Sequence, residues 1–181
     1  MSGDVSRSFV VGLGANLGDR IATLKSAVLG LEACGTVRGI SSLYETAPIG
    51  PAQPDYLNAA VLLESTLAPG QLLRELLVLE RAHGRERRER WGPRTLDLDL
   101  LYSPSLVLSQ VDLTLPHPEL VQRAFALTPL LDVAPAAIDP HSGARYADLL
   151  SALGEQGLRR LQTALSWDPR PNRVAAPGRA E

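Results

Sequence analysis

The chain has 181 residues, 45% of them hydrophobic, and a formal net charge of −2. This length and apolar content predict one well-packed domain, over residues 1–165, and exclude two ordinary catalytic domains. The sequence contains neither a run long enough to span a bilayer nor a signal-peptide layout, and its single cysteine, Cys34, cannot form an internal disulfide. We therefore expect a cytoplasmic protein. Residues 166–181 are rich in Pro, Arg and Ala and predict a flexible tail.

Hydrophobic spacing predicts alternating strands and helices in the first half of the chain. The expected strands cover residues 8–14, 36–44 and 56–63, and the expected helices run from 19 to 35 and from 69 to 83. Glycines mark the ends of both helices. A Pro- and Gly-rich loop, residues 45–55, separates the second and third strands. It is too long for a tight hairpin and is therefore a candidate for function.

Gly12, Gly14 and Gly18 lie between the first strand and the first helix, where dinucleotide-binding glycines are found. Their spacing has one residue too many for that fingerprint, so a turn-forming role is the favoured interpretation. The chain also has no P-loop motif with its lysine. Any triphosphate must therefore be held by arginines and metal ions.

Tyr56 and Asn58 begin the third strand two positions apart, so their side chains leave the same face of the sheet. An aromatic ring beside an amide suits stacking on a planar heterocycle and hydrogen bonding to it. The alternative is a packed tyrosine and a capping asparagine, which the spacing alone slightly favours.

Residues 81–94 are rich in arginine, and two aspartates follow shortly afterwards. The arginines are Arg81, Arg85, Arg87, Arg88, Arg90 and Arg94. Asp97 and Asp99 project together from one face of a predicted strand over 95–102. Paired acids on a strand are often only a solvated face. Beside so many arginines, however, they indicate a site for metal-bound phosphates, because carboxylates suit Mg²⁺ and guanidinium groups suit phosphate oxygens.

This last strand completes a βαββαβ order. It predicts an α+β fold of the ferredoxin-like kind, an antiparallel sheet with helices on one side. Residues 115–135 predict a loop and a short helix, and residues 146–153 another helix, so we also expect C-terminal helical additions. In this region His117 lies between two prolines and either faces a ligand or is simply exposed, whereas Phe125 would ordinarily belong to the core.

Four segments of the chain resemble one family, the 6-hydroxymethyl-7,8-dihydropterin pyrophosphokinases of folate biosynthesis. They are VGLGANLGD, ETAPIGPAQPDYLNAAVLLE, RWGPRTLDLDLL and LPHPELVQRAFALTPL. The resemblance implies transfer of pyrophosphate from ATP to the hydroxymethyl group of the pterin, with release of AMP. It also implies two Mg²⁺ ions bound by Asp97 and Asp99. The partners would be the two small-molecule substrates, and neither nucleic acid nor a membrane would be bound. The protein would be a monomer that can associate with neighbouring folate enzymes.

The resemblance further assigns roles to individual residues. The implied catalytic residues are Arg85, Arg94, Asp97 and Asp99. The implied pterin-binding residues are Thr46, Ala47, Ile49, Gly50, Tyr56, Asn58, Trp91 and Phe125, with the ring between Tyr56 and Phe125. The implied ATP-binding residues are Glu80, Arg85, Arg94, Leu100, Thr114, His117 and Arg123. Leu77, Asp112 and Pro118 depart from the family pattern, which leaves the ATP affinity open. The individual roles of Arg87 and Arg88 are also open.

Two other functions are compatible with the pattern. Another Mg²⁺-dependent phosphotransferase or nucleotidyltransferase would keep Asp97 and Asp99 but would not need Tyr56 and Phe125. A ferredoxin-like nucleic-acid-binding module would use the arginine-rich loop. It is disfavoured because the aspartates would repel a phosphate backbone and no aromatic pair marks the central strands.

Overall fold

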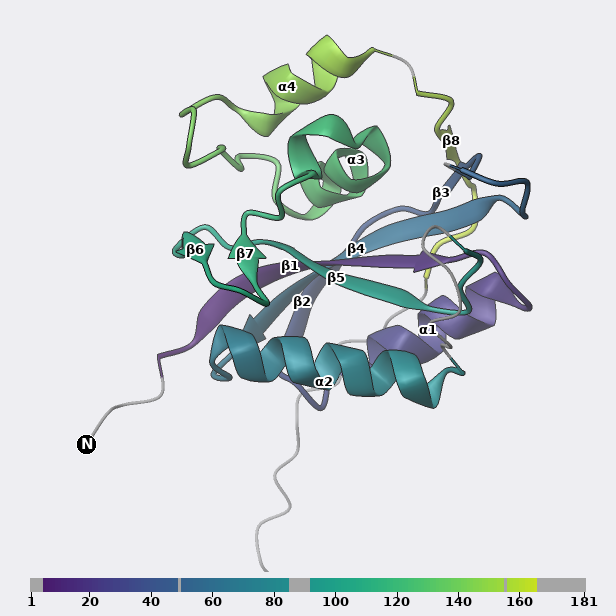
Figure 1. Ribbon diagram of the computed structural model, residues 1–181, viewed down its shortest axis with the longest axis horizontal. Helices are drawn as coiled ribbons and strands as arrows, with labels where there is room; N and C mark the ends of the chain where they lie inside the picture. Colours follow the sequence, from purple (N-terminus) through teal and green to yellow (C-terminus); the bar gives the residue numbers. More distant parts are fainter. Residues whose placement is uncertain (1–4, 49, 85–91, 155, 166–181) are drawn as a thin grey trace, which may run out of the picture.

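An antiparallel sheet with helices on both faces forms the centre of the molecule, shown in Figure 1 as a computed structural model that describes residues 5–48, 50–84, 92–154 and 156–165. Its elements in chain order are β1 (Arg7–Ala15), α1 (Arg20–Leu31), β2 (Thr36–Ile40), β3 (Tyr44–Thr46), β4 (Tyr56–Ser65), α2 (Pro69–Ala82), β5 (Asp97–Tyr102), β6 (Leu108–Ser109), β7 (Thr114–Leu115), the 3-10 turn η1 (Leu120–Gln122), α3 (Ala124–Val133), α4 (Tyr146–Leu153) and β8 (Arg159–Arg160). The predicted tail, 166–181, lies outside the described residues.

The strand order of the main sheet is β5-β1-β4-β3-β8, and β2 also pairs with β4. The central strand β1 pairs antiparallel with β4 on one side and with β5 on the other. The first and third strands of the βαββαβ unit thus occupy the middle of the sheet. This confirms the predicted ferredoxin-like α+β fold.

Each face of the sheet carries its own hydrophobic core. α1 and α2 cover one face and α3 and α4 the other (Figure 1). Because side chains alternate along a strand, Phe9, Val11 and Leu13 of β1 pack toward α1 and α2, whereas Val10 packs toward α3 and α4. The prediction of helices on one side therefore holds for the βαββαβ unit, while the C-terminal additions cover the second side.

The strand predicted over 36–44 is divided into β2 and β3, so the prediction of one strand was wrong. At the break, the Ser42 backbone N–H donates to Asp132 Oδ2 at 3.0 Å, and the Tyr44 hydroxyl donates to the same oxygen at 2.8 Å. Asp132 lies on α3, far away in the sequence. The local hydrophobic pattern cannot predict a contact between residues so far apart in the sequence.

The first helix begins as predicted but ends early. The Asp19 side chain accepts from the Ala22 N–H at 3.0 Å and caps α1, which stops at Leu31 and not at Gly35. The chain then turns toward β4 so closely that a Cβ on Gly35 would lie 2.3 Å from the Glu64 carbonyl oxygen. This close approach explains the glycine. None of the described helices has both the length and the apolar character needed to cross a membrane.

Candidate active site

A cavity of about 430 Å³ lies between the sheet and the start of α3. Its walls come from β1, β4, β5, the end of β3 and the segment that leads into α3. Most of the residues singled out in the sequence line it, namely Thr46, Ala47, Tyr56, Asn58, Arg94, Asp97, Asp99, His117, Arg123 and Phe125. The fold thus brings the expected phosphate-binding and ring-binding residues into one space.

Glycines of β1 form the floor of this cavity. Gly14 pairs with Asn58 on β4 and with Asp97 on β5, and Gly12 lies opposite Asp99. A Cβ on Gly14 would lie 3.6 Å from Asn58 Oδ1 and 3.8 Å from Asp97 Cβ. The turn-forming role predicted for Gly12 and Gly14 is therefore wrong. It holds for Gly18 alone, whose φ of 63° is in the left-handed region that glycine favours.

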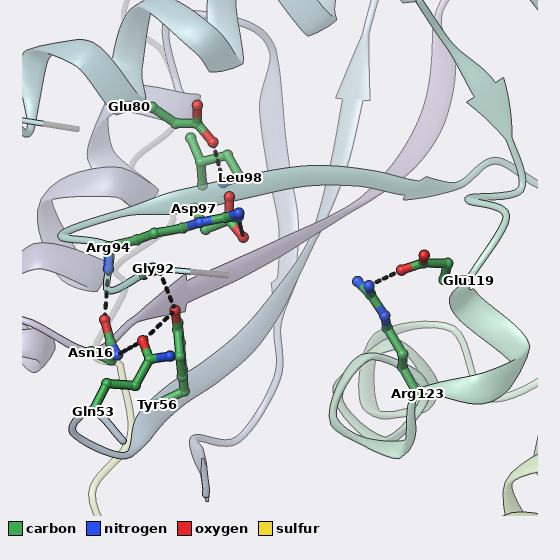
Figure 2. A network of polar contacts seen from close by, with 10 residues as sticks. All are labelled: Asn16, Gln53, Tyr56, Glu80, Gly92, Arg94, Asp97, Leu98, Glu119 and Arg123. Carbon is green, nitrogen blue, oxygen red and sulfur yellow. Dashed lines mark hydrogen bonds and ion pairs between the residues drawn. The ribbon is translucent and has the colours of Figure 1, made fainter. Parts of the chain in front are cut away.

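Asp97 and Asp99 both face the cavity, while Leu98 and Leu100 are buried on the opposite face of the strand, as predicted. Burial disfavours the charge of Asp99, and Asp97 adds repulsion, so the pKa of Asp99 is raised. Arg94 Nη1 lies 2.6 Å from Asp97 Oδ2 (Figure 2). Burial alone would lower the pKa of Arg94, but the charge and hydrogen bond of Asp97 outweigh it and the pKa is raised.

The two carboxylates fit a hard divalent cation that keeps other ligands of its own. Within the described ranges, no three His, Cys, Asp or Glu side chains are grouped so as to hold a metal ion. Among these residues, Asp97 and Asp99 would supply two carboxylates, and water and phosphate oxygens could fill other positions. This is the usual coordination of Mg²⁺ beside a phosphorylated substrate.

Asn16, which the sequence analysis missed, fixes the main chain of Arg94 (Figure 2). The Arg94 N–H donates to Asn16 Oδ1 at 2.7 Å, and the Asn16 N–H donates to the Arg94 carbonyl at 3.1 Å. The Asn16 amide also donates to Gln53 Oε1 at 2.9 Å and to the Pro54 carbonyl at 3.1 Å. Since Asn16 is only 1% exposed, it joins the segment of Arg94 firmly to the loop before β4. Its place in the GANLGD segment was the one available signal.

Arg123 and His117 approach the cavity from the side of α3. Arg123 forms an ion pair with Glu119, and its guanidinium carbon lies 5.6 Å from the centre of the Phe125 ring. Burial disfavours the cationic form of His117 and Arg123 adds to this, so the pKa of His117 is lowered although Asp99 opposes the shift. The Glu119 N–H donates to His117 Nδ1 at 3.2 Å, which places the proton of the neutral ring on Nε2. Glu119 was another residue that the sequence analysis missed.

The residues predicted to bind a ring are Tyr56 and Asn58 on β4 and Phe125 on α3. Asn58 is a buried mid-sheet residue whose amide donates to Thr46 Oγ1 at 2.8 Å, so it caps no helix. The Tyr56 hydroxyl donates to Gln53 Oε1 at 3.5 Å and to the Gly92 carbonyl at 3.4 Å. Phe125 is half-buried at the edge of the core beneath α3 and also lines the cavity. All three line the cavity, and their role in binding a ring stays a prediction.

Several residues named from the resemblance do not line the cavity. Glu80 is buried on α2, where Oε1 accepts from the Leu98 N–H at 2.8 Å and supports the backbone between the two aspartates. Leu100 belongs to the core beneath α1 and α2, Thr114 lies on β7, and Gly50 is exposed. Ile49, Arg85, Arg87, Arg88 and Trp91 lie outside the described residues.

Paired carboxylates beside arginines, in one cavity with aromatic side chains, fit an enzyme that transfers phosphate groups to a small ring compound. The comparisons agree with this class. The family model described as 7,8-dihydro-6-hydroxymethylpterin-pyrophosphokinase matches residues 10–135. The chain belongs to this family.

Named relatives and solved structures extend the comparison. A 2-amino-4-hydroxy-6-hydroxymethyldihydropteridine pyrophosphokinase of Synechocystis is 41% identical over 173 residues, which cover 93% of this chain and 89% of the relative. The mitochondrial folate synthesis bifunctional protein of Arabidopsis thaliana is 39% identical over 77% of this chain and 26% of its own length. A crystal structure of wild-type HPPK-DHPS from Plasmodium falciparum with STZ-DHP has a TM-score of 0.70 at 13% identity over 88% of this chain, and thereby supports the fold. The chain spans 47% of that solved chain.

Proposed function

We propose that this protein transfers pyrophosphate from ATP to the hydroxymethyl oxygen of 6-hydroxymethyl-7,8-dihydropterin, a step of tetrahydrofolate biosynthesis. The observation that carries the proposal is the shared cavity, which is lined both by Asp97, Asp99 and Arg94 and by Tyr56, Asn58 and Phe125. Gly14 lies between Asp97 and Asn58 on adjacent strands, so the two groups of residues meet there. Membership of the pterin pyrophosphokinase family supports the same reaction. An acceptor ring and a donor phosphate chain would thus be held next to each other.

The pterin would be held between the rings of Tyr56 and Phe125. Stacking between two aromatic rings suits a flat heterocycle, and the Asn58 amide with main-chain groups near Thr46 and Ala47 could provide hydrogen bonds to its edge. Ile49, Gly50 and Trp91 complete the pterin set that the resemblance implies, although only Gly50 is described. This arrangement would point the hydroxymethyl group toward the aspartates.

Asp97 and Asp99 would hold two Mg²⁺ ions, which when bound neutralise phosphate charge and align the attacking and leaving oxygens. Arg94, Arg123 and the Nε2–H of His117 would contact phosphate oxygens from the cavity walls. The hydroxymethyl oxygen would form a bond to the β-phosphorus as the bond from that phosphorus to the α-phosphate oxygen breaks. AMP would leave with that oxygen, and the hydroxyl proton would pass to solvent.

The other two functions are less well supported. A nucleic-acid-binding sheet needs an accessible face, but α3 and α4 cover the face of the sheet that α1 and α2 leave free. A phosphotransferase without a ring substrate would not need Tyr56, Asn58 and Phe125 in the same cavity as the aspartates.

We further propose that residues 1–165 form a single domain that acts as a monomer. The two cores share one sheet, which supports one cooperative unit. Association with a neighbouring folate enzyme is supported by the bifunctional folate synthesis protein of Arabidopsis thaliana, of which this chain matches 26%, and by the HPPK-DHPS chain of Plasmodium falciparum, of which it spans 47%.

The test of the proposed function is incubation of the purified protein with Mg²⁺, ATP and the hydroxymethyl dihydropterin. We expect AMP to form only when all three are present. Asp97→Asn should lose this activity, whereas Arg38→Ala should keep it, because Arg38 pairs with Glu64 on the surface away from the cavity. Formation of ADP, or no turnover by the folded protein, would contradict the proposal.

A further inference from the structure

In the free protein, the Arg94 guanidinium neutralises the charge of Asp97. Arg94 Nη1 lies 2.6 Å from Asp97 Oδ2, and the two side chains are 31% and 19% exposed. At this depth the pair is screened less than a surface ion pair and holds its geometry more firmly. The position beside Asp97 Oδ2 that a metal ion would need is therefore already taken by a cation of the chain.

The main chain of Arg94 is held by contacts that do not depend on its side chain. Two hydrogen bonds to Asn16, of 2.7 Å and 3.1 Å, hold the Arg94 N–H and carbonyl. The guanidinium is attached through rotatable bonds and lines the cavity. It can therefore leave Asp97 and reach a ligand in the same cavity without any change of the backbone.

A metal ion alone would gain little from this site. The described residues offer it two carboxylates, and one of them is paired with Arg94. Removing the guanidinium from Asp97 would leave a partly buried positive charge close to an incoming divalent cation, which is unfavourable. A metal-bound nucleotide differs, because its phosphate oxygens offer the guanidinium a new anionic partner.

We propose that Arg94 is the internal counter-ion of Asp97 and that the metal–nucleotide complex binds by exchange. The Asp97 carboxylate passes from Arg94 to the metal, and the Arg94 guanidinium passes from Asp97 to a phosphate oxygen. No charge is left without a partner. The inference deepens the proposed function and rests on it, because it takes metal-bound phosphates as the incoming group.

Exchange makes a specific prediction for metal binding without nucleotide. Mn²⁺ replaces Mg²⁺ in such oxygen sites, and the unbound ion can be counted by electron paramagnetic resonance. Arg94→Ala should bind Mn²⁺ on the order of tenfold more tightly than the wild type, because the guanidinium no longer competes with the metal ion for Asp97 Oδ2. Arg94→Lys keeps the positive charge and should stay weak. Arg38→Ala removes a similar ion pair outside the cavity and should match the wild type.

Two further measurements make the result unambiguous. Arg94→Ala combined with Asp97→Asn should lose the gain in Mn²⁺ affinity, and thermal melting should show that every variant is folded. Equal or weaker Mn²⁺ binding by folded Arg94→Ala would overturn the exchange. Binding of Mn²⁺ with an ATP analogue that carries a methylene between its α- and β-phosphorus is measured separately on the wild type. Absence of that binding would refute the proposed function itself.

Discussion

At the scale of single residues, the Arg94 side chain pairs with Asp97 in the free protein and would contact a phosphate oxygen in the reacting complex. Its contact with the phosphates should strengthen as charge develops, so Arg94→Ala should slow the chemical step by about 10³-fold or more. Nucleotide affinity should change by less than about tenfold, because the lost phosphate contact is offset by an ion pair with Asp97 that need not be broken.

Single-turnover kinetics separate these two quantities. Weakened nucleotide binding with a normal chemical step would show that Arg94 merely docks the nucleotide.

The two aspartates should behave differently in the metal-free protein. Asp99 is half-buried beside Asp97 and its pKa is raised, so Asp99→Asn removes a repulsion and should increase the melting temperature, by roughly 2 to 4 °C for each kcal/mol relieved. Asp97→Asn takes the carboxylate away from Arg94 and should give no such gain. Both variants should nearly abolish turnover. Equal melting temperatures for the two variants would contradict the ion pair as described.

The rings of Tyr56 and Phe125 should determine the affinity for the pterin, and their removal should leave ATP binding largely unchanged. Tyr56→Ala and Phe125→Ala should each weaken pterin binding by roughly 1 to 3 kcal/mol, the scale of stacking between a base and an aromatic ring. Tyr56→Phe keeps the ring and should bind nearly normally, because stacking depends on the ring and not on the hydroxyl. Calorimetry with a pterin analogue measures all three. Normal binding by both alanine variants would return Phe125 to a purely structural role.

At the scale of elements, a short C-terminal segment supports two walls of the cavity. β8 pairs with β3, and Glu45 of β3 forms ion pairs with both Arg20 and Arg159. Nearby, Gln156 Oε1 accepts from the Ala124 N–H at 3.1 Å and so satisfies a free donor at the start of α3. The segment thereby joins the strand that carries Thr46 to the helix that carries Phe125.

The pairing of Glu45 should make stability depend on pH. Its hydrogen bond to Arg159, followed by that to Arg20, lowers the pKa of Glu45 below its ordinary 4.5. The folded state thus favours the ionised form, and this contribution is present above pH 4.5 and disappears as the pH falls through the lowered pKa. Glu45→Gln should cost about 0.5 to 1 kcal/mol near pH 7 and nothing in strong acid.

Melting temperatures across this pH range test the prediction. Glu75→Gln, a change at an exposed glutamate of α2, is the matched control. A Glu45→Gln deficit that is the same at all pH values would mean that packing and not charge is responsible.

At the scale of the whole molecule, periodicity predicted most of the fold because most elements bury one regular face. The spacing in α2, β4 and α4 placed these elements closely. The division between β2 and β3 was not predictable, since a carboxylate on α3 imposes it through Ser42 and Tyr44. The pairing of β8 was hidden for a related reason. A two-residue strand has no period, and its partner lies far away in sequence.

The site was predictable where chemistry shows in neighbouring residues. Asp97 and Asp99 share a face because of strand geometry alone, and so do Tyr56 and Asn58. Glu119 and Asn16 could not be recognised in this way, because their roles depend on contacts with Arg123 and with the main chain of Arg94. The floor formed by Gly12 and Gly14 was misread for the same reason. The sequence shows the glycines but not the polar residues that lie beside them on adjacent strands, so a turn was predicted.

The most direct test of the central claim follows the phosphorus atoms of ATP into the product. The protein is given Mg²⁺, the hydroxymethyl dihydropterin and ATP that is labelled separately at the β- or the γ-phosphorus, and the pterin product is isolated. A transfer of pyrophosphate predicts that both labels are recovered on the pterin and that neither remains with the released nucleotide. Recovery of the γ label alone, together with ADP, would contradict the account.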